Sequence, residues 1–484
     1  MSSTASTAIG QSTPGRTREA RFVTWIVVAF LVWIPLQTPV AVLAYQYLRL
    51  PISSIVIAQG LMLVKDIWAV ALILVLFVRH AREIRFRWFD WFAIAYGVLV
   101  IVYSVGPAVF GSHLSAVAVI ASARALLVPV ELYVLGRLVG YAGVSVTTAV
   151  KAFLVVAAVA AVGTVAEFIF APGNFWVTTY DLVFFIRDVQ GVPGALDTWT
   201  TSIFAIYGSL GSADRSVGPF AHPVAAGVYF IVPLTLAVCA AWMRGLRSRT
   251  TMALTAVGVV LLTLAVLTPI SRGAWVGFLC GMVICGAVLH RYRLAVATAV
   301  VFVAIVVFVP PFSWSVRAPV AGDDSSTIGH VAAVTNDVTQ VITSDPVVGP
   351  KVGNGDSTGQ NLSPDGDAAG VGENMYLTTY ASVGPLGLLA FVIWLGALMV
   401  ELVGRVRPTV PVWISVGIGA ALFGELVAGM TASTLMRFTP AASLCLLVGL
   451  ILAQPQARFK RPDLSAVRHP RRWLGSRRAR VEPA

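Results

Sequence analysis

The amino-acid sequence predicts an all-helical protein that crosses a membrane about twelve times. Apolar residues make up 57% of the 484 residues and charged residues only 12%, with a mean hydropathy of +0.84. Such values are typical of integral membrane proteins. The apolar residues also fall in separate runs, each near the ~20 residues that a helix needs to cross a bilayer. The predicted spans are residues 22–45, 52–78, 88–108, 114–136, 147–171, 216–243, 251–269, 272–289, 294–313, 376–400, 409–430 and 438–455.

The alternation of charge predicts which connections lie on the same side. Arginines precede the first span, and every second connection after it is again basic, whereas the intervening long connections carry aspartates. Because Lys and Arg are enriched in cytoplasmic connections, both termini are predicted to be cytoplasmic. The first span is too long for a cleaved signal, so it is predicted to be retained. A transmembrane domain at 22–455 would then lie between cytoplasmic tails at 1–21 and 456–484, the second of them basic.

Two connections on the opposite, outer side are long. Residues 172–215 mix Trp and Tyr with polar residues, which suits a segment in the lipid headgroup layer. Residues 310–375, between the ninth and tenth spans, are rich in Gly, Asp and Ser. A connection of this length in a compact chain indicates a function. Its bulk, residues 311–370, is predicted to be a variable cover that shapes an acceptor path, while the chemistry lies in its last residues.

The charge and cysteine patterns exclude other classes. The net charge is +12, but nine of the 34 Lys and Arg residues lie in Arg458–Arg480 and most others lie between spans. That distribution reflects membrane topology and contact with anionic lipids, and it argues against nucleic-acid binding. All four cysteines fall inside apolar spans, which implies neither a disulfide framework nor a metal site.

Lys65 and Asp66 lie near the middle of the second predicted span, and Arg124 and Glu131 lie within the fourth, where charge is unfavourable. Lys65 and Asp66 are neighbours on one helix and point about 100° apart. Arg124 is expected at the depth of Asp66, so an Asp66–Arg124 pair is predicted, which leaves Lys65 free to face a cavity. A purely structural ion pair is the alternative. Glu425 and Arg437 are further charges near the outer ends of the last two spans.

Three motifs map to the outer ends of helices. They are Arg215-Ser-Val-Gly-Pro-Phe-Ala-His222-Pro223, Ser271-Arg272-Gly273-Ala274-Trp275 and Glu373-Asn374-Met375-Tyr376-Leu377. Guanidinium groups beside the free N–H groups of helix starts suit a phosphate or diphosphate, so Arg215 and Arg272 are candidate ligands. Interfacial anchoring is the alternative for both. Glu373 is a candidate base, or else an acid that the helix dipole favours.

These motifs resemble those of the superfamily of O-antigen ligases and O-antigen polymerases, which are polytopic membrane glycosyltransferases. The likeness covers roughly residues 200–400 and includes the long outer loop and the stretch Gly384-Pro385-Leu386-Gly387. It implies an inverting, metal-independent and cofactor-free transfer of a glycan from a polyprenyl-diphosphate carrier, such as undecaprenyl diphosphate, to an acceptor hydroxyl. The acceptor would be a glycan or a lipid, and the site would face outward from the bacterial plasma membrane.

The resemblance also implies residue roles. Arg215 and Arg272 would bind the diphosphate, together with Lys65 as the basic residue of the second helix. Ligases carry a histidine where this chain has Glu373, which puts ligase activity in doubt more than polymerase activity; a glutamate can still accept a proton from an alcohol. Secondary candidates are Arg124, His222, Asn374, Tyr376, Glu425 and Arg437.

The sequence therefore predicts a polymerase of surface polysaccharide repeats, with a chain-length regulator or a flippase as a candidate partner. Three alternatives stay open. A ligase would move the finished glycan to a lipid or cell-wall acceptor. A transporter or flippase would use charges along a transmembrane path, and a peptidoglycan polymerase of the shape-and-division type would share the lipid donor.

Overall fold

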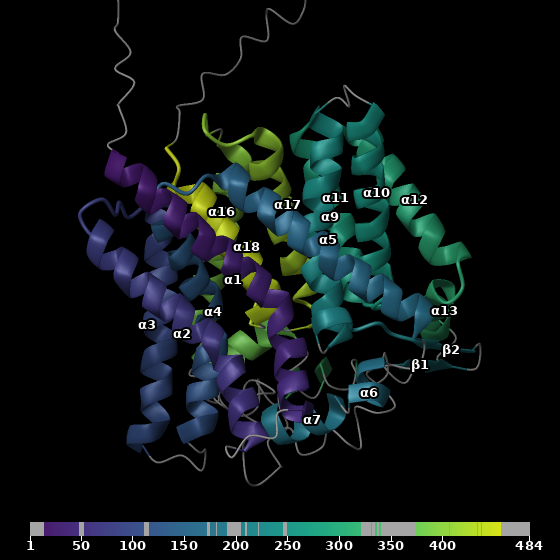
Figure 1. Ribbon diagram of the computed structural model, residues 1–484, viewed down its shortest axis with the longest axis horizontal. Helices are drawn as coiled ribbons and strands as arrows, with labels where there is room; N and C mark the ends of the chain where they lie inside the picture. The colour runs from purple at the N-terminus through teal and green to yellow at the C-terminus, as the bar shows by residue number, and fades with distance from the viewer. Residues whose placement is uncertain are drawn as a thin grey trace, which may run out of the picture.

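A computed structural model describes most of the chain outside the tails and the long loop. The described residues are 14–47, 53–110, 116–171, 175–180, 182–190, 205–208, 211–220, 222–244, 249–320, 331, 334–335, 338–339, 374–405, 407–432, 434–436 and 438–455. This part is almost entirely helical, with one antiparallel hairpin of strands β1 (Ala205–Gly208) and β2 (Gly211–Asp214) (Figure 1). The predicted all-helical membrane class is confirmed, with the hairpin as an addition.

Eight described helices are long and apolar enough to cross a membrane. They are α1 (Pro14–Tyr47), α2 (Ser54–His80), α3 (Trp88–Phe110), α4 (Ala116–Tyr141), α5 (Val146–Phe170), α9 (Pro223–Arg244), α10 (Arg249–Leu267) and α16 (Met375–Gly404). Four further apolar helices are shorter: α11 (Arg272–Val288), α12 (Tyr292–Phe308), α17 (Val412–Ala428) and α18 (Phe438–Ala453). The chain is thus a multi-pass membrane protein, and the count of twelve spans stays a prediction.

The remaining described elements are short. They are α6 (Phe175–Tyr180), α7 (Leu182–Gln190), the 3-10 turn η2 (Gly218–Phe220) and α13 (Phe312–Val320). Figure 1 shows α6 and α7 at the lower end of the bundle and the hairpin at its lower right, where α13 contacts both strands. The predicted outer segment 172–215 is therefore partly helical, while residues 191–204 and most of the long loop lie outside the described residues.

Several predicted helix boundaries differ from the structure; α1 already begins at Pro14 and not at residue 22, and proline explains two other differences. The sixth span was predicted from residue 216, but α9 begins at Pro223, because Gly218 has a φ of +55° and precedes Pro219. The ninth span was predicted to reach residue 313, but α12 ends at Phe308, shortly before two consecutive prolines. Residues 215–222 are consequently a loop packed at the end of the bundle.

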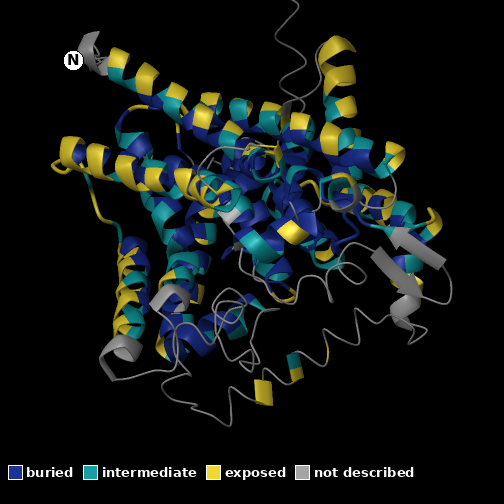
Figure 2. Ribbon diagram, turned by 60° about the horizontal axis from the view of Figure 1, so that its bottom comes forward, coloured by how far each residue is buried: buried dark blue, intermediate teal, exposed yellow. Residues whose placement is uncertain are grey.

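The outer surface of the bundle suits lipid. Large apolar side chains such as Ile67, Val78 and Val159 are more than half exposed on the outward faces of α2 and α5. Figure 2 shows buried residues at the centre and exposed residues on the outward faces of the surrounding helices. Lipid tails would cover this surface, since a water-soluble protein rarely exposes such extended apolar patches.

Glycines bring the central helices into backbone contact. A Cβ on Gly136 of α4 would lie 2.1 Å from the carbonyl oxygen of Leu446 in α18, and a Cβ on Gly449 would lie 2.2 Å from the carbonyl oxygen of Tyr133. The helices α11 and α17 meet in the same way at Gly277 and Gly424, where the corresponding distances are 2.4 and 2.6 Å. Small residues of this kind allow close packing of membrane helices.

Replacement of Gly136 by Ala should destabilise the bundle, because the new methyl group collides with the backbone of α18. Overpacking of this kind costs about 1–3 kcal/mol. The measurement is thermal unfolding of the purified protein in detergent. Gly163→Ala on α5 is the matched control, since a Cβ there meets nothing within 4 Å. Equal unfolding temperatures for the two variants would contradict the α4–α18 contact.

The two chain ends of the bundle lie together. Glu19 Oε1 of α1 is 3.3 Å from Arg79 Nη1 at the end of α2. Arg87 Nη2 donates to the carbonyl oxygen of Gln454, just after α18, at 3.5 Å. We call this the termini end, at the top of Figure 1. The opposite end, where α9, α11 and α16 begin, is called the site end; which membrane side each end faces stays a prediction.

Candidate functional site

The first motif packs on the second at the site end. The backbone N–H of Ser216 donates to the carbonyl oxygen of Thr268 at 3.2 Å, and Arg215 Nε donates to the carbonyl oxygen of Pro269 at 2.9 Å. A Cβ on Gly227 of α9 would lie 2.8 Å from the Cβ of Ser271. The loop that carries Arg215 is therefore fixed to the turn that leads into α11.

The turn between α17 and α18 joins the second motif to the third. A Cβ on Gly273 of α11 would lie 2.1 Å from Thr431 Oγ1, which explains the glycine after Arg272. Asn374 Nδ2 donates to the carbonyl oxygen of Met430 at 2.9 Å, and the Met375 N–H donates to that of Gly429 at 2.8 Å. A continuous chain of contacts thus joins all three motifs.

Asn374 and Tyr376 anchor the start of α16. The Asn374 side-chain oxygen accepts from the N–H groups of Tyr376 at 2.9 Å and Leu377 at 3.2 Å, which is an N-cap. The Tyr376 hydroxyl donates to the carbonyl oxygen of Leu426 at 2.7 Å. Glu373 lies outside the described residues, one position before this anchored start. The two secondary candidates are therefore structural supports in this region.

The break in α16 follows this anchored segment. Gly384 has a φ of +69° and a ψ of −176° inside the helix, and Pro385 follows it. Only glycine adopts this backbone readily, and proline removes one helical hydrogen bond. The Gly-Pro stretch thus separates the first turns of α16, at the site end, from the rest of the helix.

Arg215 and Arg272 reach the site end from different elements. Arg215 is 9% exposed, in the loop before η2, and Arg272 is the first residue of α11. Arg272 Nη1 donates to the carbonyl oxygen of Ser315 in α13 at 3.2 Å. Both guanidinium groups thus donate to backbone carbonyl oxygens at the site end.

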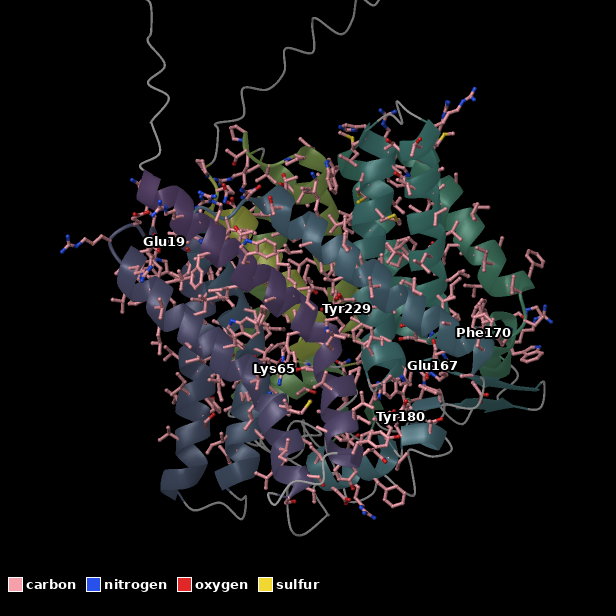
Figure 3. All side chains as sticks on the ribbon, viewed as in Figure 1. Glu19, Lys65, Glu167, Phe170, Tyr180 and Tyr229 are labelled. Atoms are coloured by element: carbon pink, nitrogen blue, oxygen red, sulfur yellow. The ribbon has the colours of Figure 1, made fainter. Side chains whose placement is uncertain are left out.

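Glu167 of α5 holds the Arg215 loop and was missed by the sequence analysis. Its Oε2 accepts from the N–H groups of Val217 at 3.1 Å and Gly218 at 2.5 Å. A Cβ on Gly218 would lie 2.0 Å from Thr164 Oγ1, one turn earlier on α5. Figure 3 places Glu167 near the end of α5 that meets the loop. The signal in the sequence is a lone carboxylate inside an apolar span.

The second group of predicted residues lies on α2 and α4. Asp66 Oδ2 is 2.8 Å from Arg124 Nη2, so the predicted Asp66–Arg124 pair is confirmed. The expectation that Lys65 is free is wrong, because Lys65 Nζ is 3.2 Å from the same oxygen and donates to the carbonyl oxygen of Met62 at 2.6 Å. The flexible lysine stem bends back along its own helix, which overcomes the 100° offset.

This charged group lies on other helices than the loop of Arg215. Figure 3 labels Lys65 and Glu167 at a similar level in that view but on α2 and α5 respectively. Glu131 Oε1, on α4, is buried and makes no hydrogen bond within the described part of the chain. No direct contact links Lys65 to Arg215 or Arg272 in that part.

The remaining candidates have different positions. His222 Nδ1 accepts from the Val224 N–H at 3.2 Å and so caps the start of α9. Glu425 is fully buried in α17, and neither carboxylate oxygen has a hydrogen-bond partner among the described residues. Arg437 lies outside the described residues. His222 therefore has a structural role at the start of α9. Glu425 lies in α17, which packs against α11, and its carbonyl oxygen accepts from the N–H of Gly429 in the following turn.

Metal binding has no support from the part of the chain that the structure describes. No group of three or more His, Cys, Asp or Glu side chains there could hold a metal ion. The expected independence of metals stays a prediction, because the acids of the long loop lie outside the described residues.

A comparison of the chain with protein-family models found no match. A comparison with curated proteins found none either. The likeness to O-antigen ligases and polymerases therefore rests on the motifs themselves and on their positions in the chain.

Proposed function

We propose that this chain is an inverting membrane glycosyltransferase that extends a surface polysaccharide on a polyprenyl-diphosphate carrier. The observation that carries the proposal is the chain of contacts that joins the loop of Arg215, the start of α11 and the start of α16. These are the three segments that carry the resemblance to O-antigen polymerases. A structural role alone would not require an arginine in this loop beside a second arginine at the start of α11.

In this proposal the chemistry uses the charges of the site end. The acceptor hydroxyl oxygen attacks the anomeric carbon, and the bond from that carbon to the diphosphate oxygen breaks. The bonding electrons leave with the diphosphate, whose negative charge Arg215 and Arg272 stabilise. Glu373 accepts the proton of the hydroxyl as general base. Attack from the face opposite the leaving group inverts the anomeric centre.

The proposal includes twelve spans, cytoplasmic termini and a site that faces outward from a bacterial plasma membrane. The arginine-rich connections at the termini end support this orientation, since such connections favour the cytoplasm. The four shorter apolar helices, α11, α12, α17 and α18, support the count. Tilted packing against neighbours and local thinning allow short helices to span.

A transporter or flippase is the second candidate. The observation that favours it is the group of charges on α2 and α4, where Asp66 binds both Lys65 and Arg124 inside a membrane helix. Such residues mark transport paths in many membrane proteins. In the glycosyltransferase proposal, Lys65 instead contributes positive charge toward the carrier diphosphate.

The purified chain, reconstituted with a lipid-linked repeat unit, is expected to produce longer lipid-linked glycans, and the chelator EDTA should leave the rate unchanged. Mass analysis of the products measures this. Transfer of an intact glycan to a different lipid would instead favour a ligase. Movement of the lipid-linked repeat across the bilayer with no new glycosidic bond would contradict the proposal and favour the flippase.

A further inference from the structure

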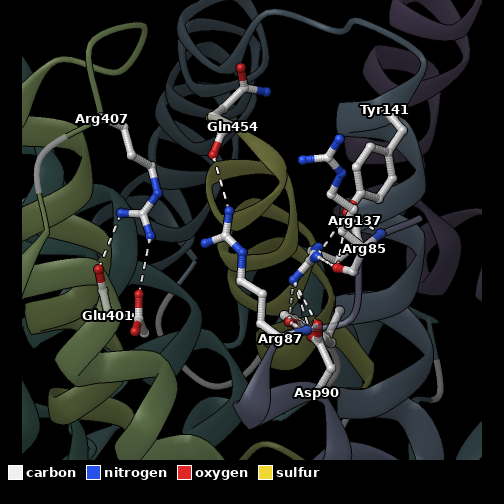
Figure 4. Close-up of polar contacts among 9 residues, drawn as sticks. Arg85, Arg87, Asp90, Arg137, Tyr141, Glu401, Arg407 and Gln454 are labelled. Carbon is white, nitrogen blue, oxygen red and sulfur yellow. Dashed lines mark hydrogen bonds and ion pairs between the residues drawn. The ribbon is translucent and has the colours of Figure 1, made fainter. Parts of the chain in front are cut away.

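Three arginines from separate connections gather at the termini end, far along the bundle from the proposed site. Arg87 precedes α3, Arg137 lies near the end of α4, and Arg407 lies between α16 and α17. Figure 4 shows Arg87 between Arg407 and Arg137 in that view. Two carboxylates, Asp90 and Glu401, accompany them. The arginines with which these two carboxylates pair determine how much of the positive charge is neutralised.

Asp90 is committed to Arg137. Arg137 Nη1 is 3.1 Å from Asp90 Oδ1, and Tyr133 donates its hydroxyl to the same carboxylate. Arg137 Nη2 donates to the carbonyl oxygen of Arg85 and to the hydroxyl of Tyr141, both at 2.9 Å. Both terminal nitrogens of Arg137 are therefore bound, and Asp90 has little charge left for a second arginine.

Glu401 is engaged mainly by an exposed arginine. Its Oε1 lies 3.0 Å from Arg405 Nη2, whereas its Oε2 lies 4.0 Å from Arg407 Nη2. The Arg407 side chain is fully buried, and its Nη1 donates to the carbonyl oxygens of Glu401 and Arg405, both at 3.2 Å. Its Nε and Nη2 make no hydrogen bond within the described residues. These two N–H groups lie along one edge of the guanidinium, which is the edge that binds two oxygens of one anion.

Arg87 presents a further buried donor. Its Nη1 makes no hydrogen bond in the described part of the chain, while Nη2 reaches Gln454. Burial lowers the pKa of the Arg87 guanidinium, and the charge of Arg137 lowers it further. Burial likewise lowers the pKa of Arg407 to about 10, with the charge of Arg87 as the next cause. The positive charges of Arg87, Arg137 and Arg407 thus repel one another, and Glu401 offsets this repulsion only in part.

We propose that Arg87 and Arg407 bind a phosphate group at the termini end. The Nε and Nη2 of Arg407 would donate to two phosphate oxygens, and Nη1 of Arg87 would donate a third hydrogen bond. A phosphate monoester or diester meets this requirement, because it offers several acceptor oxygens and a negative charge. Its source is either the headgroup of an anionic phospholipid, at whose depth these connections would lie, or free phosphate.

The test uses the full chain in a maltoside detergent, which carries no phosphate. Inorganic phosphate, compared with chloride at equal ionic strength, is expected to raise the unfolding temperature. Phosphatidylglycerol is expected to raise it as well, compared with diacylglycerol that has the same acyl chains. Arg407→Gln should raise the phosphate concentration needed for half of this stabilisation at least about tenfold, as expected for loss of charge-assisted hydrogen bonds. Arg82→Gln is the matched control, because it removes the same charge from an exposed side chain at the same end of the bundle and leaves Glu401 with its partner Arg405.

The possible results distinguish a lipid headgroup from free phosphate and also test the proposed site. A response to both compounds supports a site for the phosphate group, and a response to the lipid alone supports a headgroup site. The proposal is overturned if neither compound stabilises the protein, or if Arg407→Gln responds as strongly as Arg82→Gln. Should Arg407→Gln fail to fold, Arg87→Gln provides the same comparison, because Arg87 is only half-buried.

Discussion

Replacement of Glu373 by Gln is expected to lower the rate of glycan transfer by about 10²- to 10⁴-fold, which is the usual contribution of a general base. Glutamine has nearly the same shape but cannot accept the proton of the attacking hydroxyl. The anchored start of α16 should persist, since Asn374 and Tyr376 make its contacts. The measurement is the rate of elongation of a lipid-linked repeat by the purified protein, at saturating donor.

The matched control for Glu373→Gln is Asp365→Asn, which removes one acid from the same loop outside the proposed site. This control should elongate at the normal rate. Binding of the lipid-linked donor should be unchanged in Glu373→Gln, because the diphosphate is assigned to the arginines. Normal elongation by Glu373→Gln would show that another group accepts the proton and would remove Glu373 from the proposed site.

The positions of the motifs could be predicted from the sequence, because helix starts follow from apolar runs and from proline and glycine. Arg272 is indeed the first residue of α11, and Asn374 caps α16. The Asp66–Arg124 pair could also be predicted, since both residues lie at similar depth and an isolated charge in a membrane is unfavourable.

The supports of the site could not be predicted in the same way. Glu167 binds backbone N–H groups some 50 positions away, and backbone groups carry no signal in the sequence. The bending of Lys65 back to Asp66 depends on a flexible stem that helix geometry does not describe. The close approach at Gly136 depends on which helices become neighbours, and the apolar runs do not encode this.

Replacement of Glu167 by Ala is expected to lower kcat/KM about a hundredfold or more, although Glu167 is a positioning residue and not a catalytic one. The change leaves the N–H groups of Val217 and Gly218 buried and unpaired, at about 1–3 kcal/mol for each group. The loop can relieve this only by moving, and Arg215 would move with it. A displacement of about 1 Å at a catalytic group is enough for a hundredfold loss.

A readout that does not depend on activity separates this role from the proposed function. Amide hydrogen exchange at residues 215–220 should accelerate in Glu167→Ala and remain slow in Glu167→Gln, because the glutamine carbonyl oxygen can still accept from one N–H group. Gly163→Ala on the same helix is the control for general destabilisation of α5, since it touches nothing. Faster exchange with normal transfer would confirm that Glu167 holds the loop, but it would show that glycan transfer does not require Arg215 in this position. Unchanged exchange in Glu167→Ala would mean that the carboxylate does not hold the loop.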